Sequence, residues 1–303
     1  MKRKPLVLAV ILMLAIGYPY QAIRGQTKPN PPQKLYGLNF GPYIDGQNPH
    51  LNPQISQAQL QARLKVIAPY TEWIRTFNCT NGMEQAVPLA RRYGLKIAVG
   101  AWLDKDSRAN EREIESLIKL GKSGAADVLI VGNEVLFHKT VTEEQLVKYL
   151  QLVKREVPDL PVTTVEIYNE MLRRSRVGAL CDVIMINCYP FWEKQDIHLA
   201  LPEYQLVYKQ VRSKYAGKAV VFAEVGWPSD GKNFGPAFPS LVNAEMFFRD
   251  FTAWAAANKV PYFYFEAFDE SWKVADEPGI GAYWGIWDKD GRPKWDMSSF
   301  RKQ

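Results

Sequence analysis

The sequence has few of the residues that build metal sites and disulfide frameworks. It contains three cysteines and three histidines among 303 residues. Three cysteines are too few, and odd in number, for a disulfide framework, and Cys181 and Cys188 flank or occupy one predicted strand. We therefore expect free, buried thiols. The histidines stand far apart and form no ligand pair, so we expect neither a metal ion nor another cofactor.

The sequence also lacks a concentration of charge of one sign. The net charge of +6 comes partly from the first residues, MKRK, and the other basic residues are scattered among acidic ones. Because there is no dense Lys/Arg stripe and no nucleic-acid motif, we expect no nucleic-acid partner. Aromatic residues are plentiful, at 13% of the chain. Such rings pack in cores or line clefts that bind flat ligands such as sugars.

The N-terminus has an apolar stretch of eleven residues, Leu6–Ile16, after the basic start. This is shorter than the roughly 20 residues of a membrane-spanning helix and is typical of a secretory signal. We expect residues 1–25 to be a signal peptide or an uncleaved N-terminal anchor, residues 26–34 a Pro-rich spacer, and residues 35–303 the folded domain. The protein is therefore expected to be secreted, periplasmic or extracellular, with membrane contact only through this N-terminal segment.

Eight short apolar runs are separated by longer amphipathic segments. Continuous apolar runs, rather than strict alternation, indicate strands that are buried on both faces, as in a parallel sheet. We expect strands over residues 35–41, 73–78, 95–103, 127–136, 161–168, 182–189, 219–227 and 262–268.

The segments between the runs predict helices. Two of them open with the Ser/Thr-x-x-Gln spacing of a capping box, which marks a helix start. The expected helices cover residues 56–70, 112–124, 142–158 and 244–259. Alternating strands and helices predict an α/β fold, a single (β/α)₈ TIM barrel. An open doubly wound sheet is the alternative, but no strand is followed by a Gly-rich phosphate loop.

Acidic and polar side chains recur where the predicted strands end. The fourth strand ends in Asn133 and Glu134, the fifth carries Glu166, the seventh Glu224 and the eighth Glu266. In a TIM barrel, chemistry takes place at the carboxyl ends of the strands. A single glutamate there is more often an ion-pair partner than a catalyst. Several carboxylates on one rim, without metal ligands, favour a catalytic cleft.

Two carboxylates that act without a metal suggest glycoside hydrolysis. Glu134 lies within the apolar run VLIVGNEVLF, whose surroundings favour a protonated carboxyl that can serve as acid. Glu224 is expected to stay ionised and attack the anomeric carbon, held by Arg75 and the phenol of Tyr189. Asn133 is expected to bond a sugar hydroxyl. Strands four and seven lie on opposite sides of the barrel, so the two glutamates should face each other.

These motifs carry a family resemblance. The stretches VGNEV (131–135) and FAEVGWPS (222–229), in that order, resemble glycoside hydrolase family 17. The stretches YFYFEAFDESWK (262–273) and GAYWGIWDKDGRPKW (281–295) are similar to its bacterial branch. That branch includes β-1,3-glucanases and glucanosyltransferase domains associated with β-glucan synthesis. The resemblance covers nearly the whole chain after the N-terminal segment.

The resemblance implies a retaining mechanism with Glu134 as general acid/base and Glu224 as nucleophile. It implies substrate contacts from Asn133, Glu166, Tyr189, Trp227, Glu266 and Lys273. Further substrate-binding candidates on the rim, chosen for charge or for a ring that can pack on a pyranose, are Arg75, Tyr43, Asp269 and Trp272. Ser271 departs from the bacterial pattern, which often has Pro there, and Val225 departs from the plant pattern, which has Ser. Both differences concern subsite specificity.

The sequence therefore predicts a retaining β-1,3-glucan hydrolase that forms a covalent glucosyl-enzyme. A β-1,3-glucan transglycosylase that uses the same two carboxylates is the alternative, since only the acceptor in the second step differs. A non-catalytic glucan-binding barrel is a remote alternative. It predicts that one of the two carboxylates is lost, and both are present.

Overall fold

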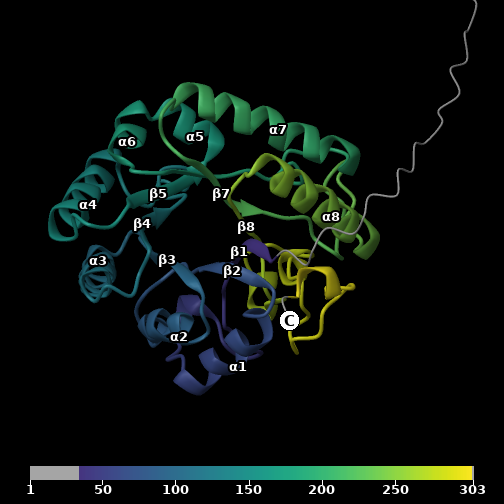
Figure 1. Cartoon of the computed structure of the whole chain (residues 1–303), viewed down its shortest axis with the longest axis horizontal. Coiled ribbons are helices and arrows are strands. Elements are labelled where there is room, and N and C mark those ends of the chain that lie inside the picture. The colour runs from purple at the N-terminus through teal and green to yellow at the C-terminus, as the bar shows by residue number, and fades with distance from the viewer. Residues whose placement is uncertain (1–33, 302–303) are drawn as a thin grey trace, which may run out of the picture. The chain divides into compact units, whose positions relative to one another are not determined.

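Eight parallel strands close into a barrel in the order β1 to β8, with β8 pairing back to β1 (Figure 1). The structure, a computed structural model, describes residues 34–301. The expected signal or anchor, and nearly all of the expected spacer, lie outside the described residues. The fold class predicted from the sequence, a single (β/α)₈ TIM barrel, is confirmed.

Each predicted apolar run overlaps one strand, and the runs extend beyond the strands into the loops; seven runs contain the whole strand, whereas β2 begins at Thr71, two residues before its predicted run. All six residues of β7 are buried, as expected for a strand covered on both faces. The strands are β1 Leu35–Asn39, β2 Thr71–Arg75, β3 Lys96–Ala101, β4 Val128–Asn133, β5 Val162–Ile167, β6 Ile184–Asn187, β7 Val220–Val225 and β8 Tyr262–Tyr264.

Helices surround the barrel, and both predicted helix starts are capped by their Ser or Thr, although the reciprocal glutamine bond of a capping box is not among the described contacts. The hydroxyl of Ser56 accepts a hydrogen bond from the amide of Gln59, and that of Thr142 from the amide of Gln145, which satisfies one amide at each helix start. The helices are α1 Gln57–Ile67, α2 Ala86–Arg92, α3 Ser107–Lys122, α4 Glu143–Glu156, α5 Tyr168–Arg173, α6 Ser175–Leu180, α7 Ile197–Lys214 and α8 Leu241–Asn258. Short 3₁₀ helices cover Pro49–Leu51, Met83–Gln85, Ser271–Val274, Gly281–Tyr283 and Ser298–Phe300. Helix α3 begins ahead of its predicted start because Asp106 caps it.

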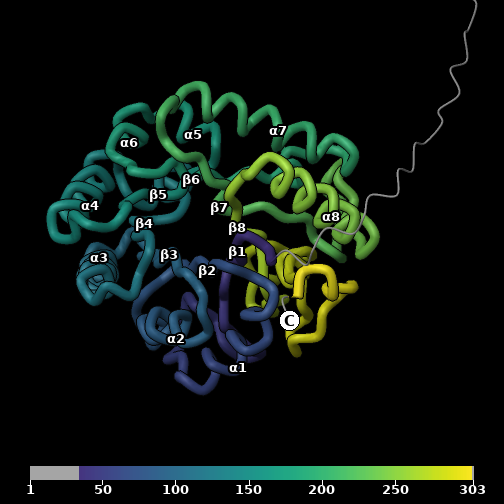
Figure 2. Tube along the Cα trace, in the orientation of Figure 1, coloured from purple at the N-terminus to yellow at the C-terminus, as the bar shows by residue number. Residues whose placement is uncertain are grey.

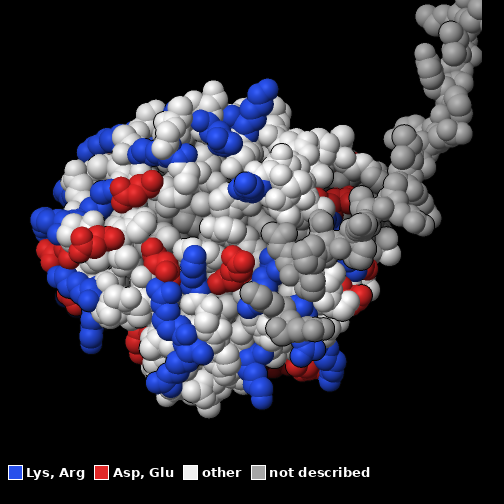
Figure 3. Space-filling view, viewed as in Figure 1, with Lys and Arg blue, Asp and Glu red and all other residues white. Residues whose placement is uncertain are grey.

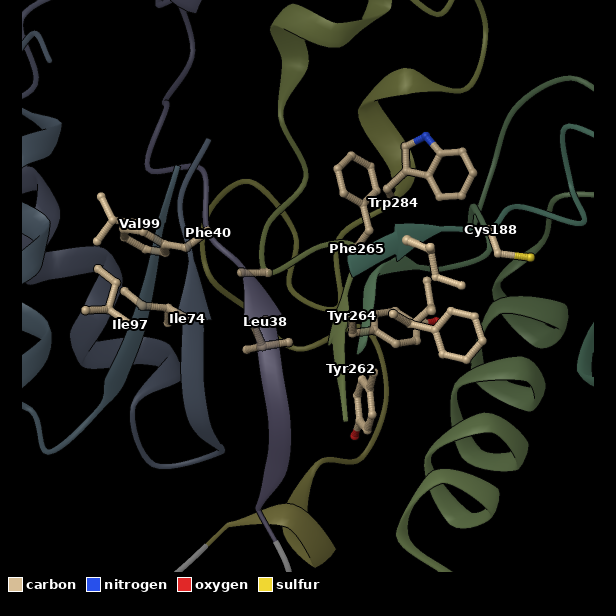
Figure 4. Close-up of a cluster of buried hydrophobic side chains, with 14 of the residues drawn as sticks. Leu38, Phe40, Ile74, Ile97, Val99, Cys188, Tyr262, Tyr264, Phe265 and Trp284 are labelled. Carbon is tan, nitrogen blue, oxygen red and sulfur yellow. The ribbon is translucent and has the colours of Figure 1, made fainter. Parts of the chain in front are cut away.

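Successive strand residues pack into different apolar layers. Ile97 and Val99 of β3 belong to the large cluster between strands and helices, part of which Figure 4 shows, whereas Ala98 between them does not. A second cluster comes from strand residues only and fills the barrel. Its members are Ala98, Ile130, Val165, Met185, Val221, Ala223 and Phe263. The cysteines are free and buried, as predicted.

The segment after β8 folds back against the barrel, next to α8 (Figure 2). The ring of Trp287 lies 5.3 Å from that of Tyr70, just before β2. Trp295 lies 5.2 Å from the ring of Phe248 on α8. Aromatic contacts of this kind stabilise a segment that has little regular structure of its own.

Charged side chains of both signs are interspersed on the face of the molecule shown in Figure 3. This distribution agrees with the scattered charges of the sequence. Among the helices between residues 34 and 301, none is long and apolar enough to cross a membrane.

Glu113 of α3 is a buried carboxylate that ties two loops at the carboxyl end of the barrel to a helix. It accepts hydrogen bonds from the amides of Cys79 (3.0 Å) and Trp102 (3.1 Å) and from the hydroxyl of Thr80. Cys79 follows β2 and Trp102 follows β3. The carboxylate therefore fixes the loops next to the end of β2, where Arg75 lies.

We predict that Glu113→Ala lowers the free energy of unfolding by about 2–4 kcal/mol, because it leaves buried amide groups without an acceptor. Glu115→Ala, at an exposed position of the same helix, is the matched control and should change it by less than about 0.5 kcal/mol. Urea unfolding monitored by circular dichroism measures both. Equal losses in the two variants would contradict this role of Glu113.

Candidate active site

Arg75 is a buried cation at the end of β2, with 1% of its surface exposed. Its Nη1 donates to Asn39 Oδ1 (2.8 Å), Glu224 Oε1 (2.9 Å) and the carbonyl of Ala223 (3.1 Å). Its Nη2 donates to Asn133 Oδ1 (2.7 Å). A buried charge requires such partners to offset its desolvation. One guanidinium thus joins the ends of β1, β2, β4 and β7.

Glu224 near the end of β7 has both carboxylate oxygens bonded. Oε1 accepts from Arg75 at 2.9 Å, and Oε2 accepts from the hydroxyl of Tyr189 at 2.8 Å. The contacts predicted between Glu224 and these two residues are present. Burial raises the pKa of Glu224, and the nearby Glu134 adds to the rise, whereas the Arg75 guanidinium and the Tyr189 hydroxyl act against it. The two donors therefore favour the ionised form of a buried carboxyl.

The carboxyl of Glu134 has polar partners, so the expectation of an apolar setting is wrong. Its Oε1 accepts from Asn187 Nδ2 (2.7 Å), and its Oε2 lies 3.2 Å from His138 Nε2. Gly132 (φ 80°) and Glu134 (φ 54°) both have left-handed backbone conformations. The pairing register of β4 with β5 also shifts between Ile130 and Asn133. The chain thus leaves the strand direction here, and the side chain reaches the polar rim.

A chain of hydrogen bonds connects the two glutamates. Asn187 Nδ2 also lies 3.4 Å from Asn133 Oδ1, which in turn accepts from Arg75. These hydrogen bonds therefore span the rim from β7 to β4, in the order Glu224, Arg75, Asn133, Asn187 and Glu134. Asn133 uses only its carbonyl oxygen in these contacts.

Glu166 of β5 is fully buried and holds the loop that follows Glu134. Its carboxylate accepts hydrogen bonds from the backbone amides of Leu136 (2.7 Å) and Phe137 (3.3 Å). Burial raises the pKa of Glu166 to about 7, although these amides oppose the rise. Its contacts are those of a residue that supports the loop.

A second buried ionic group follows β8. Lys273 forms ion pairs with Glu266 and with Glu270, the latter at 3.0 Å. Burial raises the pKa of Glu266, and Lys273 opposes this. Within the described residues, Oε1 of Glu266 and Oε1 of Glu270 are buried without a hydrogen-bond partner. A Cβ at Gly41 would lie 2.2 Å from Glu270 Oε1, so a larger residue there would force this carboxylate to move.

Tyr43 and Trp272 lie together at the rim. Their rings meet edge to face at 6.2 Å, and the hydroxyl of Tyr43 donates to Asn78 Oδ1 at 3.4 Å. Trp272 is partly exposed, and the ammonium of Lys273 lies 5.4 Å from its ring. Trp272 therefore extends the Lys273 group toward the surface, whereas Tyr43 is buried at 7% exposure.

The structure does not bring Trp227 and Asp269 into the Arg75 network. Trp227 is 1% exposed, and its indole N–H donates to the carbonyl of Phe238 at 3.0 Å. Asp269 pairs with Lys294 at 2.6 Å and accepts from the amide of Gly285 at 2.9 Å. Both residues hold loops of the barrel rim in place.

Three residues of the network, Asn39, Asn187 and His138, are absent from the predicted set. Asn39 and Asn187 are the last residues of β1 and β6. The rule that identified the glutamates, a polar residue where an apolar run stops, applies to them as well. For His138, the only signal in the sequence is its position four residues after Glu134.

The chain matches a family model described as the BtgE/BtgC glycoside hydrolase domain over residues 37–285. It is 25% identical over 267 residues to the glucan 1,3-beta-glucosidase of Saccharomyces cerevisiae, covering 80% of this chain and 85% of that protein. It is 27% identical to the probable glucan endo-1,3-beta-glucosidase btgC of Aspergillus fumigatus, covering 77% of this chain and 38% of that protein.

A similar solved structure is the glycoside hydrolase family 17 beta-1,3-glucanosyltransferase from Rhizomucor miehei. The TM-score is 0.77 at 26% identity, covering 87% of this chain and 97% of that chain. These relatives are all fungal, so they give no support to the bacterial branch that the C-terminal motifs suggested.

We predict that Tyr189→Phe raises the pKa of Glu224 further, because it removes a hydrogen bond to a charged acceptor, which contributes about 1.5–3 kcal/mol. As the pH falls, Glu224 of this variant would then become protonated at a higher pH than Glu224 of the native protein. A ¹³C-NMR titration of labelled glutamate carboxyl groups measures this, with Glu224→Gln to assign the resonance.

Tyr215→Phe is the matched control, since its hydroxyl donates to the carbonyl of Met171 at 2.6 Å and not to a carboxylate. It should leave the titration of Glu224 unchanged. An unchanged titration in Tyr189→Phe would show that the phenol does not stabilise the ionised carboxylate.

Proposed function

The chain belongs to the BtgE/BtgC glycoside hydrolase domain family, and on this basis we propose that it hydrolyses β-1,3-glucosidic bonds in β-glucans with retention of configuration. The observation that carries the proposal is the pair of rim carboxylates in different settings. Glu224 is bonded to a buried cation, whereas Glu134 is bonded to an amide and an imidazole. The names of the fungal relatives support β-1,3-glucan as the substrate class.

In the first step, Glu224 attacks the anomeric carbon while Glu134 gives its proton to the departing glycosidic oxygen. The carbon–oxygen bond breaks and an ester to Glu224 forms. Arg75 and Tyr189 orient Glu224 and keep it ionised before the attack. In the second step, Glu134 takes a proton from water, the resulting hydroxide oxygen bonds to the anomeric carbon, and Glu224 is released.

Several neighbouring groups support sugar binding next to this pair. The amide nitrogen of Asn133 is free to donate, because its described contacts use the oxygen. We propose Glu266 and Lys273 as further contacts of sugar hydroxyl groups; both side chains are buried, at 1% and 9% exposure. The partly exposed ring of Trp272 supplies apolar surface, with the buried ring of Tyr43 packed against it. We propose Glu166, Trp227 and Asp269 as residues that support the site without touching the sugar.

Transfer of the glucosyl group to another glucan is the second candidate. It uses the same covalent intermediate and differs only in the acceptor. The similarity to the Rhizomucor miehei glucanosyltransferase favours it. Trp102 and Phe137, which follow β3 and β4, also favour transfer. They are 40% and 48% exposed, and exposed rings can hold an acceptor sugar.

The finer expectations are also proposals. We propose that residues 1–25 act as a secretion signal or anchor and that the enzyme works outside the cytoplasm, on the basis of the basic start and the apolar stretch Leu6–Ile16. Membership of family 17 is supported by the motifs around Glu134 and Glu224. Only the motifs over 262–273 and 281–295 support the bacterial branch.

Sizing the products formed from laminaripentaose over time tests the function. We predict shorter oligosaccharides only, with the Glu224→Ala variant slower by roughly 10⁴-fold or more because no ester can form. Its melting temperature, compared with that of the native protein, controls for folding. Products longer than the substrate would instead identify the transferase. A complete lack of turnover on any β-1,3-glucan would contradict the substrate class.

A further inference from the structure

The chain makes a fixed turn directly after Glu134. The amide of His138 donates to the carbonyl of Glu134 at 2.9 Å, so residues 134–138 form one helical turn. Residues four apart on such a turn lie side by side. The carboxylate of Glu166 binds the amides of Leu136 and Phe137 in the middle of the turn. The neighbouring strand β5 therefore fixes the position of His138 relative to Glu134.

His138 links the Glu134 carboxyl to solvent. Its Nε2 lies 3.2 Å from Glu134 Oε2, while Asn187 holds the other oxygen at 2.7 Å. The side chain of His138 is 57% exposed and that of Glu134 is 16% exposed. One oxygen of the carboxyl is thus bound by a neutral amide and the other by a group that can change its charge near neutral pH.

We propose that His138 is a positioning residue for Glu134, which holds Oε2 in place and, through its own charge, favours the carboxylate form that the second step requires. This inference rests on the proposed function, because it assigns the acid/base role to Glu134. Glu134 must carry a proton in the first step and must be a carboxylate in the second. A neighbour that changes charge alters the balance between these two states.

The pair can rearrange without exchanging a proton with solvent. An imidazolium donates its Nε2–H to the carboxylate, whereas a neutral ring with a bare Nε2 accepts from the acid O–H. Breaking the Nε2–H bond and forming the Oε2–H bond converts one arrangement into the other, and the net charge of the pair is unchanged. The exposed ring can afterwards take up or release a proton to water.

The charges around His138 favour its cationic form. The hydrogen bond with Glu134 raises the pKa of His138, although partial burial acts the other way. Glu166 from β5 and Asp104 from the loop after β3 also raise this pKa. The imidazolium therefore persists to a higher pH than for an ordinary histidine, and it is lost as the pH rises through the raised value.

The test compares the pH profiles of kcat/KM for the native enzyme, His138→Gln and His138→Arg. Each is measured on laminaritetraose and on a dinitrophenyl β-laminaribioside, whose leaving group needs no proton from Glu134. His138→Gln removes the positive charge beside the Glu134 carboxyl. We expect His138→Gln to move the alkaline limb on laminaritetraose up by about half a pH unit, as for a partly exposed ion pair.

His138→Arg carries a permanent charge, so its alkaline limb on laminaritetraose should lie at the native pH or below it. Neither variant should move the alkaline limb on the aryl glycoside. His198→Gln, at an exposed position on α7, is the matched control and should keep the native profile. If the alkaline limb of His138→Gln stayed at the native pH, or shifted equally on both substrates, the role of His138 would be overturned while the proposed function stands. Absence of turnover by the native enzyme on both substrates would overturn both.

Discussion

The buried charge of Arg75 is the constraint on which the rest of the site depends. A guanidinium with 1% of its surface exposed must be paired, since an unpaired buried charge costs several kcal/mol. Its partners come from the carboxyl ends of β1, β4 and β7. Closing the barrel therefore brings Asn39, Asn133 and Glu224 to one cation. The same contacts that neutralise Arg75 orient Glu224 and favour its ionised form.

The two rim glutamates differ in ways that match the two roles of a retaining mechanism. Glu224 is bonded to a permanent cation and a phenol, which suits a carboxylate that must attack. Glu134 is bonded to Asn187 and His138 and is partly exposed, which suits a group that must gain and lose a proton. Different surroundings can give two carboxyl groups of one site different functions. Arg75, Asn133 and Asn187 connect the two.

Much of this could be predicted from the sequence, because strand periodicity and barrel topology fix where strand ends meet. That geometry places Glu224, Arg75 and Tyr189 on one rim, and their contacts are expected on this ground. The surroundings of Glu134 do not, because they depend on the left-handed backbone at Gly132 and Glu134. Trp227 and Asp269 are at the rim but are bonded to loops that come later in the chain. The position of a residue at a strand end does not predict which loops cover it.

Mapping the covalent intermediate tests the role of Glu224 most directly. The enzyme is incubated with a 2-deoxy-2-fluoro-β-laminaribiosyl fluoride, whose fluorine slows the second step, and is then digested and analysed by mass spectrometry. The fluorinated disaccharide is predicted on the peptide that contains Glu224, attached to that side chain. A label on another residue, or turnover with no label at all, would contradict the assignment of Glu224 as the nucleophile.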